Sequence, residues 1–309
     1  MRIAITGATG LIGRRLARDL DPKDLTVLTR DASVARKSVA AGRYVTWDGV
    51  SDLEPSVFEG VDVVYHLAGE PVASGRWTAA KKVRILESRE LGTRAVVDAM
   101  ARSGSKATLV SASAVGFYGS RGDERLTEES APGEGFLPEV CRTWETEAAK
   151  AARHGSRVAM VRIGIVLAAE GGALSKMLPL FRLGLAGRLG SGDQWMPWIH
   201  IDDVVGLLRR AAEDATIEGA LNAAAPQVVT NAGFTRALAS ALGRPAFLPA
   251  PSFALRVAMG ELAEVVLASQ RVIPEKALRV GYSFRHPDLG EALASIVDAE
   301  PLERREVAA

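Results

Sequence analysis

Short runs of apolar, largely β-branched residues alternate along the first half of the chain with segments whose apolar positions recur at helical spacing. This alternation is typical of βαβ units, and it predicts a parallel sheet. The predicted strands are apolar almost throughout, as strands covered by helices on both faces must be. They span residues 2–6, 25–29, 43–47, 61–67, 107–113 and 157–163, with helices predicted over 11–20, 79–102 and 138–153. The last helix begins at Pro138, whose missing N–H costs nothing at a first helical position.

The pattern changes in the second half of the chain. After residue 164 a glycine-rich stretch leads to a short strand and a helix over "MPWIHIDDVVGLLRRAAED", which are expected to return to the sheet. From residue 246 a proline-punctuated segment is typical of short helices. We therefore predict a main α/β domain over 1–245, in which 165–200 contribute the substrate side. A small, mainly helical C-terminal lobe over 246–297 and a frayed tail over 298–309 follow it.

Charge narrows the possible partners. The 38 lysines and arginines nearly cancel the 37 aspartates and glutamates, and no basic cluster is interleaved with aromatic residues. The sequence therefore predicts neither a nucleic-acid partner nor an anionic membrane surface. A small molecule is the expected partner.

The apolar runs of the sequence bear on the cellular location of the protein, and its cysteine and histidines bear on whether it binds a metal. No run reaches the roughly 18 to 20 uninterrupted apolar residues of a membrane span, because "VAMVRIGIVLAA" is shorter and contains Arg162. The opening "MRIAITGATG" is typical of a strand and a turn and not of a leader peptide, so a cytoplasmic location is expected. One cysteine cannot form an internal disulfide, and the four histidines show no ligand spacing, so no metal site is predicted.

The stretch "AITGATGLIGRRLARDL" carries three glycines directly after the first predicted strand, where a helix begins. Gly7 permits a tight turn, Gly10 lets the backbone approach a pyrophosphate, and Gly13 lets the helix pack closely on the sheet. The helix N-terminus adds oriented N–H donors. The sequence therefore predicts a dinucleotide-binding sheet of the Rossmann type. Its expected cofactor contacts here are Thr6, Gly7, Gly10, Leu11, Ile12 and Gly13.

The end of the second predicted strand distinguishes NAD from NADP. An NAD site places an acidic residue there to hold both ribose hydroxyls, whereas this strand ends in "VLTRD" with Thr29 and Arg30. Arg30 suits a 2′-phosphate, and Arg14 adds charge nearby. Asp31 leaves NAD open as the alternative, but NADP(H) is favoured over NAD(H).

Seven further segments carry a resemblance to a known family. Together with "TGATGLIG", the segments "DVVYHLAG", "LVSASAVGFYG" and "WIHIDDVV" resemble the extended short-chain dehydrogenase/reductase superfamily. More narrowly, "GEPVASGRWTAAKKVRILESR", "VCRTWE", "RIGIVL" and "VIPEKALRVGYSFRHPDL" are similar to its branch of nucleoside-diphosphate-sugar epimerases with a small C-terminal domain of unknown function. The resemblance runs over residues 1–297 in the same order, and it implies the Rossmann-type fold predicted above.

The resemblance implies roles for residues at the ends of the later strands. Asp48 would lie near the adenine, or would be a turn carboxylate before Gly49. Leu67, Ala68 and Gly69 would run along the cofactor. Ser111 and Ser113 end the fifth strand, where family enzymes have a hydroxyl that binds the reacting oxygen. Ser113 is preferred because it is nearer the carboxyl rim, with a turn serine as the alternative.

The superfamily's proton-transfer device is altered in this chain. Relatives carry a tyrosine followed four residues later by a lysine, one helical turn apart, and the lysine lowers the pKa of the phenol. Here the same spacing holds Cys141 and Glu145. A carboxylate raises the pKa of a neighbouring acid, so Cys141 is a poor thiolate. We read it as a small residue lining the nicotinamide end or packed in the core, with a nucleophile as the weakest alternative.

Other residues are candidates for the proton donor or for the substrate side. Tyr118, in the loop after Ser113, and Glu145 itself are the alternatives. Arg89 is either an anion site facing the cofactor or part of a solvated helix face. His200 is either functional or a structural residue before a cap-like Asp202.

Two functional hypotheses follow from these motifs. The first is an NADP(H)-dependent, epimerase-like oxidoreductase acting on a small carbonyl or hydroxyl compound, for which the resemblance implies a nucleotide sugar. The second is a catalytically silent protein that binds NADP(H) and reports its redox state, because the usual tyrosine and lysine are absent. The resemblance also implies a homodimer formed through the long helices.

Overall fold

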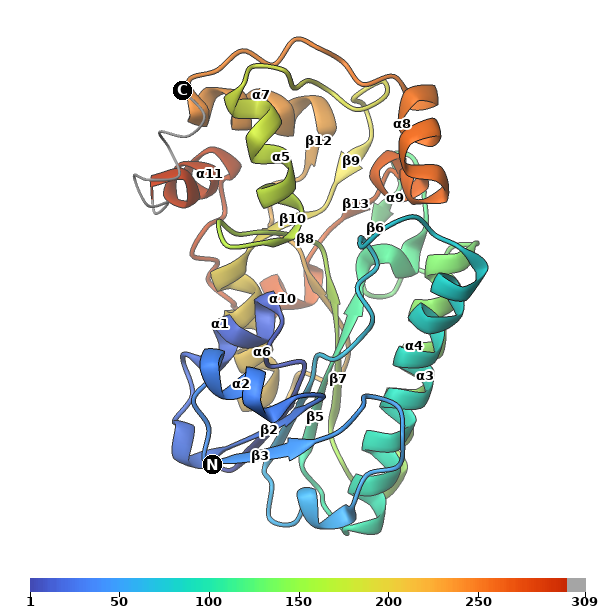
Figure 1. The fold of residues 1–309 in the computed structure, drawn as a ribbon, viewed down its shortest axis with the longest axis vertical. Helices are drawn as coiled ribbons and strands as arrows, with labels where there is room; N and C mark the ends of the chain where they lie inside the picture. Colours follow the sequence, from blue (N-terminus) through green and yellow to red (C-terminus); the bar gives the residue numbers. More distant parts are fainter. Residues whose placement is uncertain (299–309) are drawn as a thin grey trace.

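Seven parallel strands form the central sheet of the computed structural model, which describes residues 1–298 (Figure 1). Strand β1 lies inside the sheet, and the chain adds β2 and β3 on one side of it and β4, β5, β7 and β11 on the other. The order therefore reverses between β1 and β4, which creates the switch point where doubly wound sheets bind ligands. The strands are β1 (Ile3–Thr6), β2 (Leu25–Thr29), β3 (Arg43–Thr46), β4 (Val63–His66), β5 (Thr108–Ala114), β7 (Val158–Ile163) and β11 (Gly219–Ala223).

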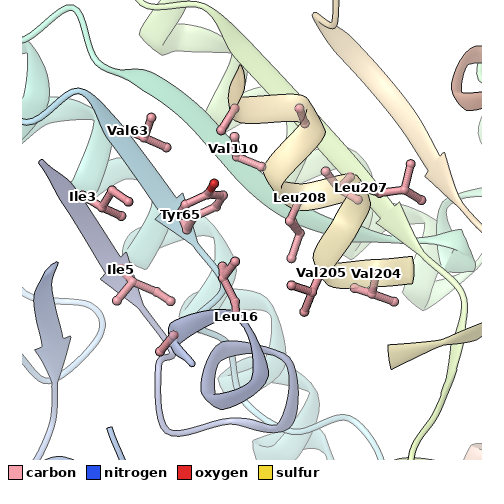
Figure 2. Close-up of a cluster of buried hydrophobic side chains, with 14 of the residues drawn as sticks. Ile3, Ile5, Leu16, Val63, Tyr65, Val110, Val204, Val205, Leu207 and Leu208 are labelled. Atoms are coloured by element: carbon pink, nitrogen blue, oxygen red, sulfur yellow. The ribbon is translucent and has the colours of Figure 1, made fainter. Parts of the chain in front are cut away.

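Helices cover both faces of the sheet, so its strands are buried nearly throughout. Figure 1 shows α3 (Ala79–Arg102) and α4 (Phe136–Ala149) on one face. On the other lie α1 (Leu11–Ala17), α2 (Ala32–Ser38) and α6 (Ile201–Glu213). Figure 2 shows side chains of β1, β4 and β5 meeting those of α1 and α6, with Tyr65 and Leu208 in the middle of this cluster.

Most of the predicted elements are confirmed, with three corrections. The expected short strand is β10 (Trp198–His200), and it pairs with β8 (Ile165–Leu167) outside the main sheet. The sheet instead gains β11, which lies outside the predicted strands, because α6 carries the chain back to its edge. Helix α4 begins at Phe136, two residues before the predicted start, and Pro138 still lies in the first turn, where N–H groups have no helical partner.

A second layer of short elements lies beyond one end of the sheet (Figure 1). Helices α5, α7 and α11 share an apolar cluster that includes Leu178, Phe234 and Leu293. Two-stranded ribbons join this layer to the sheet. The elements are α5 (Gly172–Arg182), β9 (Trp195–Met196), β12 (Val229–Thr230), α7 (Asn231–Leu242), α8 (Ser252–Met259), α9 (Ala263–Leu267), α10 (Glu275–Arg279) and α11 (Leu289–Asp298), with β13 (Arg271–Val272) paired to β6 (Arg125–Leu126).

The C-terminal segment is helical, as predicted, but its parts pack on different neighbours. Ala277 of α10 joins the core of the main sheet, whereas Leu289 and Leu293 of α11 join the cluster around α7. The boundary at 245/246 stays a prediction. The predicted tail lies outside the described residues, apart from Asp298. No helix within residues 1–298 is both long enough and apolar enough to cross a membrane.

Candidate cofactor and substrate site

The ends of three adjacent strands bring the predicted site residues into one row. Parallel register places Thr6 opposite His66 and His66 opposite Ser111. Thr6 and His66 are the last residues of β1 and β4, whereas Ser111 lies in the middle of β5, which continues through Ser113 to Ala114. The segments that follow these strands meet at the carboxyl edge of the sheet, where its switch point lies. Ser111 is fully buried, and its hydroxyl donates to the carbonyl of Ala112, so it is oriented within its own strand.

The first turn after β1 has room for glycine alone. Gly7 has φ of 72°, and a Cβ there would lie 2.6 Å from the carbonyl carbon of Leu67. A Cβ on Gly13 would lie 2.3 Å from the carbonyl oxygen of Gly7. Gly10 caps α1 without a capping side chain, and the first turn holds no acidic residue. The helix N-terminus therefore presents N–H groups that suit an anion.

Leu11 and Ile12 open α1 from opposite sides. A Cβ built on Gly171 would meet Leu11 at 3.5 Å, which shows that the chain before α5 lies against Leu11. Ile12 packs on the core beneath the sheet. Both residues are half-buried, and they form the first turn of α1.

A buried hydrogen-bond network fixes the loop after β4. The Thr6 hydroxyl accepts from the backbone N–H groups of Leu67 and Ala68, each at 3.1 Å. Its own proton is then available to His66 Nδ1 at 2.8 Å, and His66 Nε2 lies 3.0 Å from the Thr93 hydroxyl. Burial, followed by the charge of Arg89, lowers the pKa of His66 to about 4. The neutral imidazole thus ties the first strand to the loop expected to follow the cofactor.

Arg30 and Asp31 take different roles after β2. The Arg30 side chain is exposed, and it makes no hydrogen bond or ion pair with any residue of 1–298. Asp31 caps α2, with its Oδ1 accepting from the N–H groups of Ser33 at 2.8 Å and Val34 at 3.1 Å. The Ser33 hydroxyl, which donates to Oδ1 at 2.6 Å, and then these two N–H groups lower the pKa of Asp31. Its carboxylate is therefore committed to the helix, while the guanidinium beside it is free for an anion.

Asp48 is a turn carboxylate before Gly49, which was the alternative to a place near the adenine. Its Oδ1 accepts from the backbone N–H groups of Val50 at 2.9 Å and Ser51 at 2.8 Å. These hydrogen bonds lower the pKa of the exposed carboxyl. The Asp48 carboxylate is thereby held in the turn that contains Gly49.

Arg89 is buried and faces the loop after β4, so it is not part of a solvated helix face. Its guanidinium donates to the carbonyls of Glu70 at 3.2 Å and Ile85 at 3.0 Å, and lies 4.9 Å from the ring centroid of Trp144. A Cβ on Gly69 would meet it at 3.2 Å. Arg89 therefore supports the backbone of the loop at Gly69.

Ser113 and Glu145 meet directly. The Ser113 hydroxyl donates to Glu145 Oε1 at 2.7 Å, and both side chains are buried. Arg162 on β7 binds the same carboxylate through two bonds of 2.8 Å, from Nε to Oε1 and from Nη2 to Oε2. The fork geometry of this ion pair fixes the orientation of the carboxylate. The cation that a lysine supplies in relatives thus has a counterpart here, on another element.

Tyr118 belongs to the same network because it contacts Arg162 at Nη1, the guanidinium nitrogen that does not bind Glu145. Its hydroxyl accepts from Arg162 Nη1 at 2.9 Å and lies 2.7 Å from Asn222 Oδ1, to which it can donate. Tyr118 is fully buried, and burial raises its pKa to about 12. Its hydroxyl is therefore committed to holding Arg162, which weighs against a proton-donor role.

Cys141 lies beside the network but in apolar surroundings. Its side chain is 3% exposed and belongs to a cluster with Val115, Phe117 and Val272. Burial raises the pKa of the thiol to about 12, an effect that Arg89 opposes and Glu145 reinforces. The thiol is neutral at ordinary pH, which agrees with a packing role and disfavours a nucleophile.

Two histidines far apart in the sequence meet at the start of α6. The rings of His200 and His286 lie 3.7 Å apart between centroids, and with Asp202 they form a group whose ligand atoms lie within 4.8 Å of one another. His200 Nδ1 accepts from the N–H of Asp202 and so caps α6 itself, a role that was expected of Asp202. Arg15 holds Asp202 through a 2.9 Å bond, so a cation already occupies this carboxylate.

Sequence reasoning missed two residues of the site, Arg162 and Asn222. Arg162 was visible as the one charge in an apolar strand, a signal that a buried partner exists. Nothing local indicated that Asn222 on β11 would accept from Tyr118, because β11 was not predicted.

Comparison with known proteins places these features in context. The model of the NAD dependent epimerase/dehydratase family matches residues 3–224, and that of a domain of unknown function, DUF1731, matches residues 250–296. An epimerase family protein of Mycobacterium bovis is 41% identical over 293 residues, which cover 94% of this chain and 96% of the relative.

Two solved structures resemble this one over nearly the whole chain. The human epimerase family protein SDR39U1, crystallised with NADPH, is 34% identical with a TM-score of 0.86 and is covered to 100%, against 97% of this chain. A nucleoside-diphosphate sugar epimerase from Corynebacterium glutamicum is 36% identical with a TM-score of 0.79, over 99% of this chain and 61% of that one.

Proposed function

Because the chain belongs to the NAD dependent epimerase/dehydratase family, we propose that it binds NADP(H) and acts as an oxidoreductase on a small carbonyl or hydroxyl compound. The observation that carries this proposal is the glycine turn after β1, in which a Cβ on Gly7 or Gly13 would collide with backbone. Such a turn before an uncapped helix fits a pyrophosphate. When bound, the nicotinamide supplies or accepts the hydride.

The choice of NADP over NAD rests on Arg30. Its guanidinium follows β2, is exposed and has no hydrogen bond or ion pair within residues 1–298, so it is available to a 2′-phosphate, and the neighbouring Asp31 is used as a helix cap. The human relative crystallised with NADPH supports the same choice. Gly7, Gly10, Leu11, Ile12 and Gly13 would hold the pyrophosphate, and Leu67, Ala68 and Gly69 would lie along the cofactor.

Proton exchange is assigned to Ser113 and Glu145. With the Ser113 hydroxyl already donating to Glu145, its oxygen can accept a proton from a substrate hydroxyl as its own proton passes to the carboxylate. The reverse movement serves a carbonyl substrate. Arg162 and Tyr118 are positioning residues in this scheme, and Cys141 fills the space beside them. A nucleotide sugar is one candidate substrate, supported by the name of the Corynebacterium relative.

A second candidate is a silent NADP(H) sensor, and one observation favours it. Glu145 is fully engaged by Ser113 and by both arms of Arg162, and a proton placed on it has to weaken a buried ion pair. If that cost is too great, the site binds cofactor without turnover.

Cofactor preference is tested by measuring the affinities of the wild type and of Arg30→Ala for NADPH and for NADH in fluorescence titrations. Losing a charge-assisted contact to phosphate costs about 1.5–3 kcal/mol, so NADPH affinity falls about tenfold or more while NADH affinity holds. Arg43→Ala is the matched control. Arg43 is also exposed, but it is the first residue of β3, whereas Arg30 follows the last residue of β2. An unchanged ratio of the two affinities in Arg30→Ala contradicts the NADP assignment.

Catalysis is tested with NADPH and a panel of carbonyl compounds. Ser113→Ala and Glu145→Gln are expected to lose turnover and keep NADPH affinity, whereas Cys141→Ala keeps both. Turnover that survives in Ser113→Ala rules out the proton path. Absence of turnover in the wild type, combined with a partner that distinguishes the NADP⁺ and NADPH forms, favours the sensor.

A further inference from the structure

Two arginines lie side by side on the ribbon formed by β6 and β13, which joins the sheet to the second layer (Figure 1). Register pairs Arg125 with Arg271 and Leu126 with Val272. Leu126 and Val272 are buried in the cluster around Cys141. Since side chains alternate between the faces of a ribbon, Arg125 and Arg271 both point away from that cluster, on one common face.

Neither guanidinium is neutralised. Across residues 1–298, Arg125 and Arg271 make no hydrogen bond and no ion pair, and Arg271 Nε is buried without a partner. The carboxylates close by in sequence are engaged, Asp123 by the indole N–H of Trp195 and Glu124 by Arg121. Like charges directly opposite each other destabilise a ribbon, and a buried N–H without a partner adds to the cost.

Trp195 holds Arg271 in place. The guanidinium carbon lies 4.9 Å from the indole centroid, and the indole is itself fixed by its bond to Asp123. Contact with an aromatic ring leaves the N–H groups of a guanidinium directed outward in its plane. With the exposed Arg125 on the same face, the two guanidiniums offer N–H groups to the oxygens of an anion.

The ribbon flanks the proposed proton-transfer residues. Gln270 donates to the carbonyls of Val115 at 2.8 Å and Gly119 at 2.9 Å, in the loop that follows Ser113. Beyond the ribbon, the Ile273 carbonyl accepts from Asn222, the same side chain that lies against Tyr118. The residues on either side of β13 thus contact the loop and the side chain next to the Ser113 and Glu145 network, and Arg125 and Arg271 lie on the other face of the same ribbon.

We propose that Arg125 and Arg271 form an oxyanion-binding site that holds a phosphate or carboxylate group of the substrate. As a substrate site, this rests on the function proposed above. The site selects substrates that carry an anionic group in addition to the reacting carbonyl or hydroxyl. Its affinity falls as salt rises, because the recognition is between charges.

The test measures anion binding by calorimetry with NADP⁺ present, which keeps the probes out of the cofactor site. Pyrophosphate and malonate are the two probes, and whichever binds more tightly identifies the group as phosphoryl or carboxylate. Arg125→Gln and Arg271→Gln are each expected to weaken the preferred probe about tenfold or more, and Arg271→Lys less. Arg153→Gln, an exposed and unpaired arginine elsewhere, is the matched control.

A stability measurement distinguishes a binding role from a structural one. Without anion, Arg125→Gln is expected to melt at or above the wild-type temperature, because repulsion is relieved; a clear loss of stability points to a structural arginine and contradicts the proposal. The proposal is also overturned if neither probe binds the wild type, or if all variants bind the probes equally well. NADPH titration of the same samples reports on the proposed function separately, since neither arginine lies at the cofactor turn.

Discussion

At the scale of single residues, Gly7 is the strictest requirement of the site. Its Cβ position is occupied by the backbone of Leu67 and Ala68, and its φ is 72°. Gly7→Ala is expected to lose NADPH binding and several degrees of melting temperature, because both the backbone conformation and the contact resist a methyl group.

Gly104 offers a matched control, with φ of 68° and nothing within 4 Å of a built Cβ. Gly104→Ala therefore carries only the conformational cost, about 1–2 kcal/mol. Melting curves and NADPH titrations of the two variants separate the effects. Equal losses in both would show that close backbone approach at Gly7 does not matter.

Residues of the site differ in how far the sequence predicts them. The glycines were predictable because strand, turn and helix are adjacent in the chain. The spacing of Cys141 and Glu145 was visible for the same reason, since both lie on one helix. The pairing of Glu145 with Arg162 was hidden, because it depends on α4 crossing β7, and no local pattern encodes that contact.

At the scale of elements, the start of α6 anchors a distant segment. Asp203 is fully buried, and its two oxygens accept from the N–H groups of Arg285 at 2.8 Å and His286 at 2.9 Å. The Tyr282 hydroxyl lies 3.2 Å from the same carboxylate. A single side chain thereby fastens the link between α10 and α11 to the helix that returns the chain to the sheet.

Asp203→Asn is expected to loosen this link. The amide group replaces one acceptor by a donor that faces another N–H, which costs about 1–3 kcal/mol. Hydrogen exchange should accelerate at the amides of Arg285 and His286 and through α11. Asp214→Asn is the control, because Asp214 follows the other end of α6 and bonds Arg210 and Thr216 instead. Equal exchange in the two variants would contradict the anchoring role.

Elements were predicted best where their pattern was long and their neighbours were consecutive. The six strands up to β7 follow each other with helices between them, so their apolar runs were sufficient. In contrast, the sequence of β10 predicts a strand, but β10 pairs outside the main sheet. The backbone hydrogen bonds of β10 are made with β8, which lies beside it. The partner of a two- or three-residue strand is decided by tertiary packing, which sequence periodicity does not report.

At the scale of the whole molecule, buried histidines make stability depend on pH. The pKa of His66 is lowered to about 4 by burial and then by Arg89, whereas an unfolded chain titrates near about 6.5. Between these values the unfolded state binds more protons, so the free energy of unfolding falls as pH drops. For His66 the loss reaches about 3 kcal/mol.

Urea unfolding between about pH 7 and about pH 4 measures this loss. His66→Gln should flatten the dependence, with a pH-independent cost for the lost hydrogen bonds, and His200 contributes a remaining slope in the same direction. His154→Gln is the control, since His154 is exposed. A slope unchanged by His66→Gln would show that other groups control the acid limit.

The distribution of the last thirty or so described residues has a consequence for biosynthesis. Residues 269–298 supply one strand of the ribbon beside the proposed proton-transfer residues, a helix against the edge strand, a link on α6 and a helix on α7. The glycine turn, in contrast, is complete once the first four strands have left the ribosome. At roughly 5–20 residues per second, translation then separates synthesis of the glycine turn from synthesis of the last ribbon by many seconds. The two halves of the proposed site are therefore made at different times.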